Sequence, residues 1–181
     1  MSGLIINHCS PTLAGLKTGS LFSYRFDDVK KLHSKLRELN RIFVPKDMRV
    51  VPLFEKDGKA LIYVYRPKKL KADLSDEVSK KILCECGYDC KSPEEYIVAI
   101  SKRLGDGCDF PHEIGLFLGY EPSDVDGFMH RKEDFLFVGT WKVYGNEKEA
   151  KKRFEKFRKC TEVYSKCYKN NFSLEKLTVS K

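Results

Sequence analysis

The dipeptide Asp57-Gly58 separates two strand-like runs, residues 49–55 and 59–66, and constrains the fold more than any other feature of the sequence. Asp and Gly accept the positive φ angles that the two central positions of a type I′ turn require. The sequence therefore predicts an antiparallel β-hairpin. Pro52 has no backbone N–H for a ladder hydrogen bond, so we expect its strand to lie at a sheet edge or to carry a bulge.

Amphipathic helices are predicted on both sides of this hairpin. Apolar residues recur three and four positions apart across residues 27–43, and again along a long C-terminal segment, 146–169, whose first residue is a favourable cap. The stretch Ser92-Pro93-Glu94-Glu95 is typical of a capping box with proline in the first helical position. Two shorter helices are expected to begin near Pro111 and Pro122.

The other strand-like segments lie towards the two ends of the chain. They are short runs at residues 4–7 and 20–25 and a longer run at 135–144. An isolated hairpin is marginally stable, so we expect the run at 135–144 to join the sheet of the hairpin. The sequence predicts an α/β protein with an α+β tendency, in which helices cover a mixed sheet of about five strands and the middle section is helical.

We expect one domain over residues 1–181, because no linker, repeat or low-complexity tract interrupts the chain. Its sheet-forming segments are 1–66 and 135–145, its helical section is 67–134, and 146–169 is the long helix. No apolar run is long enough to cross a bilayer, and the first residues do not resemble a signal peptide. These observations predict a cytoplasmic protein without a membrane partner.

The chain is basic and rich in cysteine. Its 34 Lys and Arg residues against 26 Asp and Glu give a net charge of +8, and it has seven cysteines. Positive charge favours anionic partners such as nucleic acids, anionic lipids and phosphorylated small molecules. An odd number of cysteines in a reducing compartment favours free thiols over a disulfide framework.

The first candidate site lies where the predicted strand at 4–7 meets a helix predicted to start at Ser10-Pro11. Cys9 would lie just outside the helix N-terminus, where free N–H groups and the helix dipole stabilise a thiolate or bind an anion. Four more residues would complete the anion site: His8, Ser10, Thr12 and Lys17. The alternative is that Cys9 is a small buried core residue and Ser10 only a cap.

The second candidate site is His112-Glu113, which the sequence places in the first turn of a helix that starts near Pro111. Adjacent helical side chains point in different directions, so the two residues do not form a pair, although either could act alone as an acid or base. The alternative is that Glu113 only caps the helix and complements its dipole.

Two further patterns carry weaker functional hypotheses. Cys84, Cys86 and Cys90 are closely spaced, with Cys108 further on, but the second cysteine pair of a structural zinc site is missing, so no metal site is predicted. The basic residues of segment 146–169 could follow a nucleic-acid backbone. Interspersed glutamates and the absence of a nucleic-acid-binding motif favour a solvated helix face instead.

Three segments together resemble a bacterial family of domains of unknown function, number 3793, over nearly the whole chain. They are H-C-S-P-T-L-A-G-L-K at residues 8–17, F-P-H-E-I-G-L-F-L-G-Y at 110–120 and W-K-V-Y-G-N at 141–146. The resemblance implies one domain of bacterial cytoplasmic origin. It implies no activity and no catalytic residues.

The leading functional hypothesis is a small-molecule or anion-binding site, based on a thiol, where the two predicted helix starts meet. Cys9 would be the nucleophile, Lys17 an anion stabiliser and His112 a proton-transfer group, which requires Cys9 and His112 to lie close together. The rival hypothesis is a non-catalytic module that binds nucleic acid or a protein partner through the basic helix. The sequence specifies no cofactor and no oligomeric state.

Overall fold

The predicted hairpin is part of a three-stranded antiparallel sheet in the computed structural model, which describes residues 1–106, 109–131 and 133–180. The central strand of this sheet is β3 (Lys59–Tyr65). It pairs on one side with β2 (Arg49–Lys56) and on the other with β1 (Gly19–Arg25). The hairpin and the strand predicted at 20–25 are thus confirmed.

The turn and the proline of this hairpin have the predicted geometry. Asp57 and Gly58 have φ angles of 50° and 71°, as a type I′ turn requires. β2 lies at the edge of the sheet, and its register shifts between Pro52 and Phe54. The proline therefore occupies an irregular edge strand, where the missing N–H costs little.

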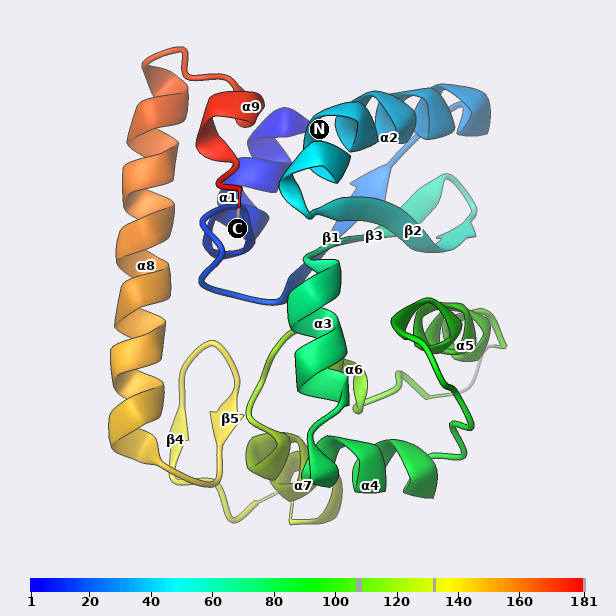
Figure 1. Cartoon of the computed structure of the whole chain (residues 1–181), viewed down its shortest axis with the longest axis vertical. Helices are drawn as coiled ribbons and strands as arrows, with labels where there is room; N and C mark the ends of the chain where they lie inside the picture. The colour runs from blue at the N-terminus through cyan, green and yellow to red at the C-terminus, as the bar shows by residue number, and fades with distance from the viewer. Residues whose placement is uncertain (107–108, 132, 181) are drawn as a thin grey trace.

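The sheet is buried on both faces because successive side chains of a strand point to opposite sides. On one face, Ala60, Ile62 and Val64 of β3 join a core cluster formed with three helices. These helices are α1 (Ser2–Leu13), α2 (Val29–Phe43) and α9 (Leu174–Leu177), and a short 3₁₀ turn, η1 (Val44–Lys46), follows α2. Figure 1 shows the three helices together on this side of the sheet.

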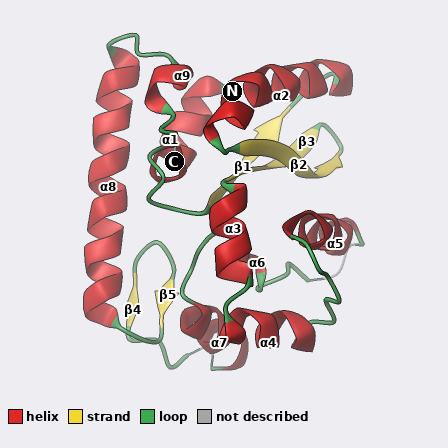
Figure 2. Ribbon diagram, in the orientation of Figure 1, coloured by secondary structure: helices red, strands yellow, loops and turns green. Residues whose placement is uncertain are grey.

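The opposite face of the sheet carries Tyr63 and Tyr65, which join a second core cluster built from the helical middle section. Its helices are α3 (Pro67–Leu74), α4 (Glu77–Glu85), α5 (Pro93–Gly105), α6 (Ile114–Phe117) and α7 (Pro122–His130). Helices dominate this half of the molecule (Figure 2). The predicted cap is confirmed, since the N–H of Glu95 donates to the Ser92 side chain over 3.3 Å, while the Glu95 carboxylate accepts the N–H of Lys91 rather than that of Ser92.

The segment predicted as one strand at 135–144 is instead a separate small hairpin. β4 (Phe137–Val138) pairs only with β5 (Lys142–Val143), in a second antiparallel sheet. The prediction that this segment joins the first sheet is wrong. Its apolar side chains Trp141 and Val143 pack instead on a long helix, and this packing gives a two-stranded hairpin the partner it needs. The combination of helices and strands is confirmed, with the strands in two antiparallel sheets.

The long helix is α8 (Glu147–Lys169), which runs along one side of the molecule from the small hairpin to α1 and α9 (Figure 1). Asn146 caps it as predicted, since its side chain accepts the N–H of Glu149 over 3.1 Å. In the first half of the predicted apolar stripe, Ala150 and Phe157 are buried, and in the second half Tyr164 is partly buried against the first core cluster. None of the described helices is long and apolar enough to cross a bilayer.

The N-terminal segment differs most from its prediction. Residues 4–7 are not a strand, and no helix starts at Ser10, because α1 continues from Ser2 through both. Ile5, Cys9 and Leu13 are spaced by four residues and are fully buried, as expected for one face of a single helix. Pro11 lies near the C-terminal end of α1. Its missing N–H removes one hydrogen bond from the last turn of the helix, which ends at Leu13.

Candidate functional site

Cys9 lies inside α1 and is fully buried in the first core cluster. The prediction of a thiol at a helix start is therefore wrong. Burial raises the pKa of the thiol to about 12, although the nearby Lys17 and a hydrogen bond with Ser20 act in the opposite direction. A thiol with this pKa is protonated at neutral pH, and its burial keeps reagents away from it. Cys9 is therefore a core residue, as the alternative interpretation of the sequence held.

Two other residues of the predicted anion site are also part of the core. Ser10 and Thr12 are fully buried. The Ser10 hydroxyl donates to the carbonyl of Ile6 over 2.5 Å, and Thr12 shares a 2.9 Å hydrogen bond with Ser20. Both hydroxyls are thus engaged within the protein and do not reach a ligand.

Glu113 and His112 precede the helix that was predicted to contain them, because α6 begins at Ile114. Glu113 occupies the N-cap position of α6, but its side chain makes no capping hydrogen bond there. Its carboxylate is 2% exposed, lies 2.9 Å from Nε of Arg103, and accepts the Tyr88 hydroxyl over 3.0 Å. These two contacts satisfy the buried carboxylate and link the segment before α6 to Arg103 and Tyr88, which is a structural role. His112 points elsewhere and is exposed.

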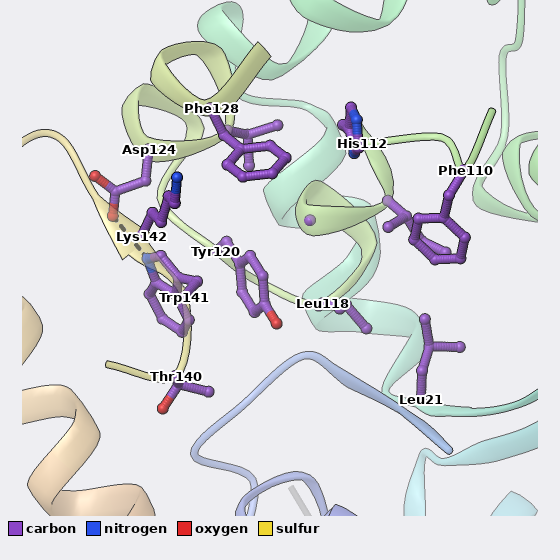
Figure 3. A pocket seen from close by; sticks show the side chains of 13 residues that line it. Leu21, Phe110, His112, Leu118, Tyr120, Asp124, Phe128, Thr140, Trp141 and Lys142 are labelled. Carbon is purple, nitrogen blue, oxygen red and sulfur yellow. Dashed lines mark hydrogen bonds between the residues drawn. The ribbon is translucent and has the colours of Figure 1, made fainter. Parts of the chain in front are cut away.

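His112 lines a cavity of about 410 Å³ that we call the aromatic pocket (Figure 3). Four aromatic side chains surround it: Phe110, Tyr120, Phe128 and Trp141. Leu21, Ile114, Leu118 and Val125 add aliphatic surface. The lining residues come from β1, the α6–α7 region and the β4–β5 hairpin, so the pocket forms only when the small hairpin packs against the middle section.

The ring positions in the aromatic pocket are fixed by contacts between the rings. Tyr120 stacks on Trp141 with a centroid distance of 4.2 Å and an interplanar angle of 21°. His112 meets Phe128 edge-on at 4.9 Å. Lys142 extends over Phe128, with Nζ 5.8 Å from the ring centroid. Such stacked, edge-on and cation–π geometries hold the rings in defined orientations.

Asp124 holds the hairpin side of the aromatic pocket in place. It lies in the first turn of α7 and is 3% exposed. Its Oδ2 accepts the indole N–H of Trp141 over 2.8 Å, and its Oδ1 accepts the backbone N–H groups of Tyr144 and Gly145 over 2.8 and 3.0 Å. Because both oxygens are engaged, Asp124 orients Trp141 and is not available to a ligand.

Lys17 connects the first segment of the chain to the aromatic pocket. Its Nζ lies 5.3 Å from the ring centroid of Tyr120, which in turn stacks on Trp141. Burial lowers the pKa of Lys17 to about 8, an effect that the neighbouring Cys9 opposes. The segments around residues 17, 120 and 141 therefore meet through Lys17, Tyr120 and Trp141.

Cys9 and His112, which were predicted to lie close together in one site, do not share a site in the structure. Cys9 belongs to the first core cluster, and His112 lines the aromatic pocket, whose lining does not include Cys9. Nothing in the local sequence predicted the roles of Tyr120, Phe128 and Asp124. The only signal available was that Gly119-Tyr120 and Trp141 lie within the motifs that carry the family resemblance.

The closely spaced cysteines do not form a metal site within the described residues. No group of three or more His, Cys, Asp or Glu side chains there is arranged to hold a metal ion. Cys84 lies in the last turn of α4 and is exposed, whereas Cys86 and Cys90 are partly buried. Cys108, the fourth member of the set, lies outside the described residues.

The basic face of α8 is largely paired within the helix. Four cations lie within 4.0 Å of a glutamate three or four positions away on the same helix: Lys151, Lys152, Arg158 and Lys159. Such pairs offset each other's charge at the surface. These pairs offset part of the positive charge of α8, and the lysines at its C-terminal end form part of a groove described below.

Comparison with known proteins places the chain in a family. The family model described as a protein of unknown function (DUF3793) matches residues 5–178, so the chain belongs to this family. No curated protein and no solved structure matches the chain.

Proposed function

We propose that this protein binds a small organic molecule in the aromatic pocket. The observation that carries the proposal is the convergence of four aromatic rings, from separate parts of the chain, around a cavity of about 410 Å³. Binding sites for small molecules are typically concave, largely apolar cavities of about 300–1,000 Å³ with a few polar groups that fix orientation. The pocket has this size and composition.

The lining of the aromatic pocket indicates the chemistry of the ligand. Flat aromatic walls favour a ring system that stacks against them. Among the ionisable lining residues, Asp124 is engaged by Trp141 and two backbone N–H groups, whereas the exposed His112 can donate a hydrogen bond to an oxygen of a ligand. Lys142, which lies over the rings of Phe128 and Phe135, adds positive charge to the lining, so a neutral or acidic ring compound fits best.

His112 is the candidate proton-transfer group of the aromatic pocket, because a neutral imidazole has one nitrogen that donates and one that accepts a hydrogen bond. Its ring is exposed and oriented by the edge-on contact with Phe128. The proposal needs no catalytic step, and a proton-transfer role for His112 would follow only once a ligand is known. A cytoplasmic location also remains a prediction of the sequence.

The proposal is tested with 8-anilinonaphthalene-1-sulfonate, an aromatic anion that fluoresces when it leaves water. We expect saturable binding to the folded protein, and we expect Phe128→Ala to weaken it about tenfold, because a lost aromatic wall costs about 1–2 kcal/mol. Phe172→Ala is the matched control, since Phe172 is 47% exposed and does not line the pocket. Equal affinities for all three proteins, or no saturable binding, would contradict the proposal.

A further inference from the structure

A second cavity, of about 580 Å³, lies between α1 and α8. We call it the basic groove. It shares only Thr140 with the aromatic pocket. Its floor is apolar, formed by Pro11, Phe154 and Phe157, and its rim carries the polar residues His8, Lys17, Thr140, Arg158, Thr161, Glu162, Ser165, Lys166 and Lys169.

The groove side of α8 is a single helix face. Arg158, Glu162, Ser165 and Lys169 are spaced by three or four residues, so their side chains project in the same direction. Lys17 and His8 face them from the N-terminal segment. His8 is held by a stack on Phe22, with a centroid distance of 5.9 Å and an interplanar angle of 9°.

The charge of the basic groove is unbalanced. It is lined by the cations Arg158, Lys17, Lys166 and Lys169 and by one carboxylate, Glu162. Arg158 already binds this carboxylate, with Nη1 2.5 Å from Oε1. In the part of the chain that the structure describes, no carboxylate forms an ion pair with any of the three lysines, whereas Lys151 and Lys152 near the start of α8 are each paired with a glutamate.

Lys17 adds an independent observation. Its side chain is partly buried, and the partner of its amine is the ring of Tyr120. Burial disfavours the charged form of this amine, which lowers its pKa to about 8. A cation removed from water in this way gains most from an anion placed beside it.

We propose that the basic groove binds a small, multiply charged anion of the phosphate class. Lys17 would contact it from the α1 side, and Lys166 and Lys169 from α8. Thr161 and Ser165 lie between these cations on the same helix face, where hydroxyl groups can donate to phosphate oxygens. The basic groove is a bounded cavity of about 580 Å³, so a compact anion fits it better than the extended backbone of a nucleic acid.

The experiment is isothermal titration of the full chain with inorganic pyrophosphate at low ionic strength and neutral pH. We expect saturable binding at one site, weakened at least tenfold in the double variant Lys166→Ala/Lys169→Ala. The matched control is Lys148→Ala/Lys156→Ala, which removes two exposed lysines of the same helix that do not line the groove. Because both variants lower the net charge equally, the control separates contacts in the groove from the general attraction of a basic protein.

A second readout tests the contact with Lys17. At a pH between 8 and 9, a bound anion should favour the charged amine, so the amine should take up protons on binding. Net proton exchange is obtained from titrations in buffers of different ionisation enthalpy. Lys17→Met should remove the uptake by the amine and leave only the protons that pyrophosphate itself exchanges in this range. The absence of saturable binding, equal losses in the two double variants, or unchanged proton uptake in Lys17→Met would each overturn the proposal. Tighter binding of an oligonucleotide, weakened equally in both double variants, would indicate non-specific attraction and would also overturn it.

Discussion

Replacing Arg66 with methionine is expected to lower the free energy of unfolding by about 3–5 kcal/mol, because the change leaves buried carbonyl groups without a donor. Arg66 directly follows β3 and is only 1% exposed. Its Nε donates to the carbonyl of Thr12 over 2.7 Å, and its Nη2 donates to those of Leu13 and Val179 over 2.7 and 2.8 Å. One guanidinium thereby binds the C-terminal end of α1 and the C-terminal tail.

The position of Arg66 explains why it tolerates burial. The last carbonyls of a helix have no partner within the helix and carry partial negative charge, which a cation stabilises. Arginine supplies several donors in a fixed fork, whereas lysine supplies a single ammonium. Arg66→Lys is therefore also expected to destabilise the fold, by about half as much.

Urea unfolding followed by circular dichroism measures this effect. Arg37→Met is the matched control, since Arg37 lies exposed on α2, and a change there should stay within about 0.5 kcal/mol. A loss below about 1 kcal/mol for Arg66→Met would show that water or a rearranged tail satisfies the carbonyls, contrary to our account.

Replacing Asp124 with alanine is expected to cost about 3 kcal/mol and to release Trp141 from its position. Two buried donors, the indole N–H of Trp141 and the backbone N–H of Tyr144, would lose their acceptor, and so would the partly buried N–H of Gly145. In Asp124→Ala the small hairpin should separate from α7, and the binding of the aromatic probe should weaken at least tenfold. Asp124→Asn keeps one acceptor oxygen, so its cost in stability should be smaller.

Unfolding experiments and the emission of the single tryptophan measure the two parts of this prediction. Asp126→Ala is the control on the same helix, because the one ion pair of Asp126 among the described residues is with the exposed His130 at 3.1 Å, a contact worth less than about 1 kcal/mol. If Asp124→Ala retained the stability and the probe affinity of the Asp126 control, Asp124 would not position the pocket wall.

The parts of the fold that the sequence predicted correctly have local causes. The β2–β3 hairpin follows from the φ requirements of Asp57-Gly58, and the starts of α5 and α8 follow from the caps Ser92 and Asn146. These signals act within a few residues and do not depend on the rest of the chain.

The wrong predictions concern segments whose structure depends on distant partners. Ser10-Pro11 has the sequence of a helix start, but the buried face of Ile5, Cys9 and Leu13 continues the helix through it. The run at 135–144 has strand propensity throughout, yet its partner is α8 rather than the first sheet. Tertiary packing overrides the local pattern in both cases.

The candidate site shows the same division. His112 and Lys17 were identified from residue type and local context, and both line cavities in the structure. The aromatic walls could not be predicted, because Tyr120 and Trp141 meet only through the packing of the small hairpin on the middle section. A site assembled from separate segments leaves little trace in the local pattern of any one of them.

The most direct test of the central claim uses the single tryptophan of the chain, which forms part of the pocket wall. Protein labelled with 5-fluorotryptophan should give one ¹⁹F resonance, and titration with 8-anilinonaphthalene-1-sulfonate should shift it to saturation with the dissociation constant obtained from probe fluorescence. This result would place the probe against Trp141 in the aromatic pocket. A probe that binds saturably while the resonance stays unchanged would occupy another part of the protein, and the assignment of the aromatic pocket as the binding site would be wrong.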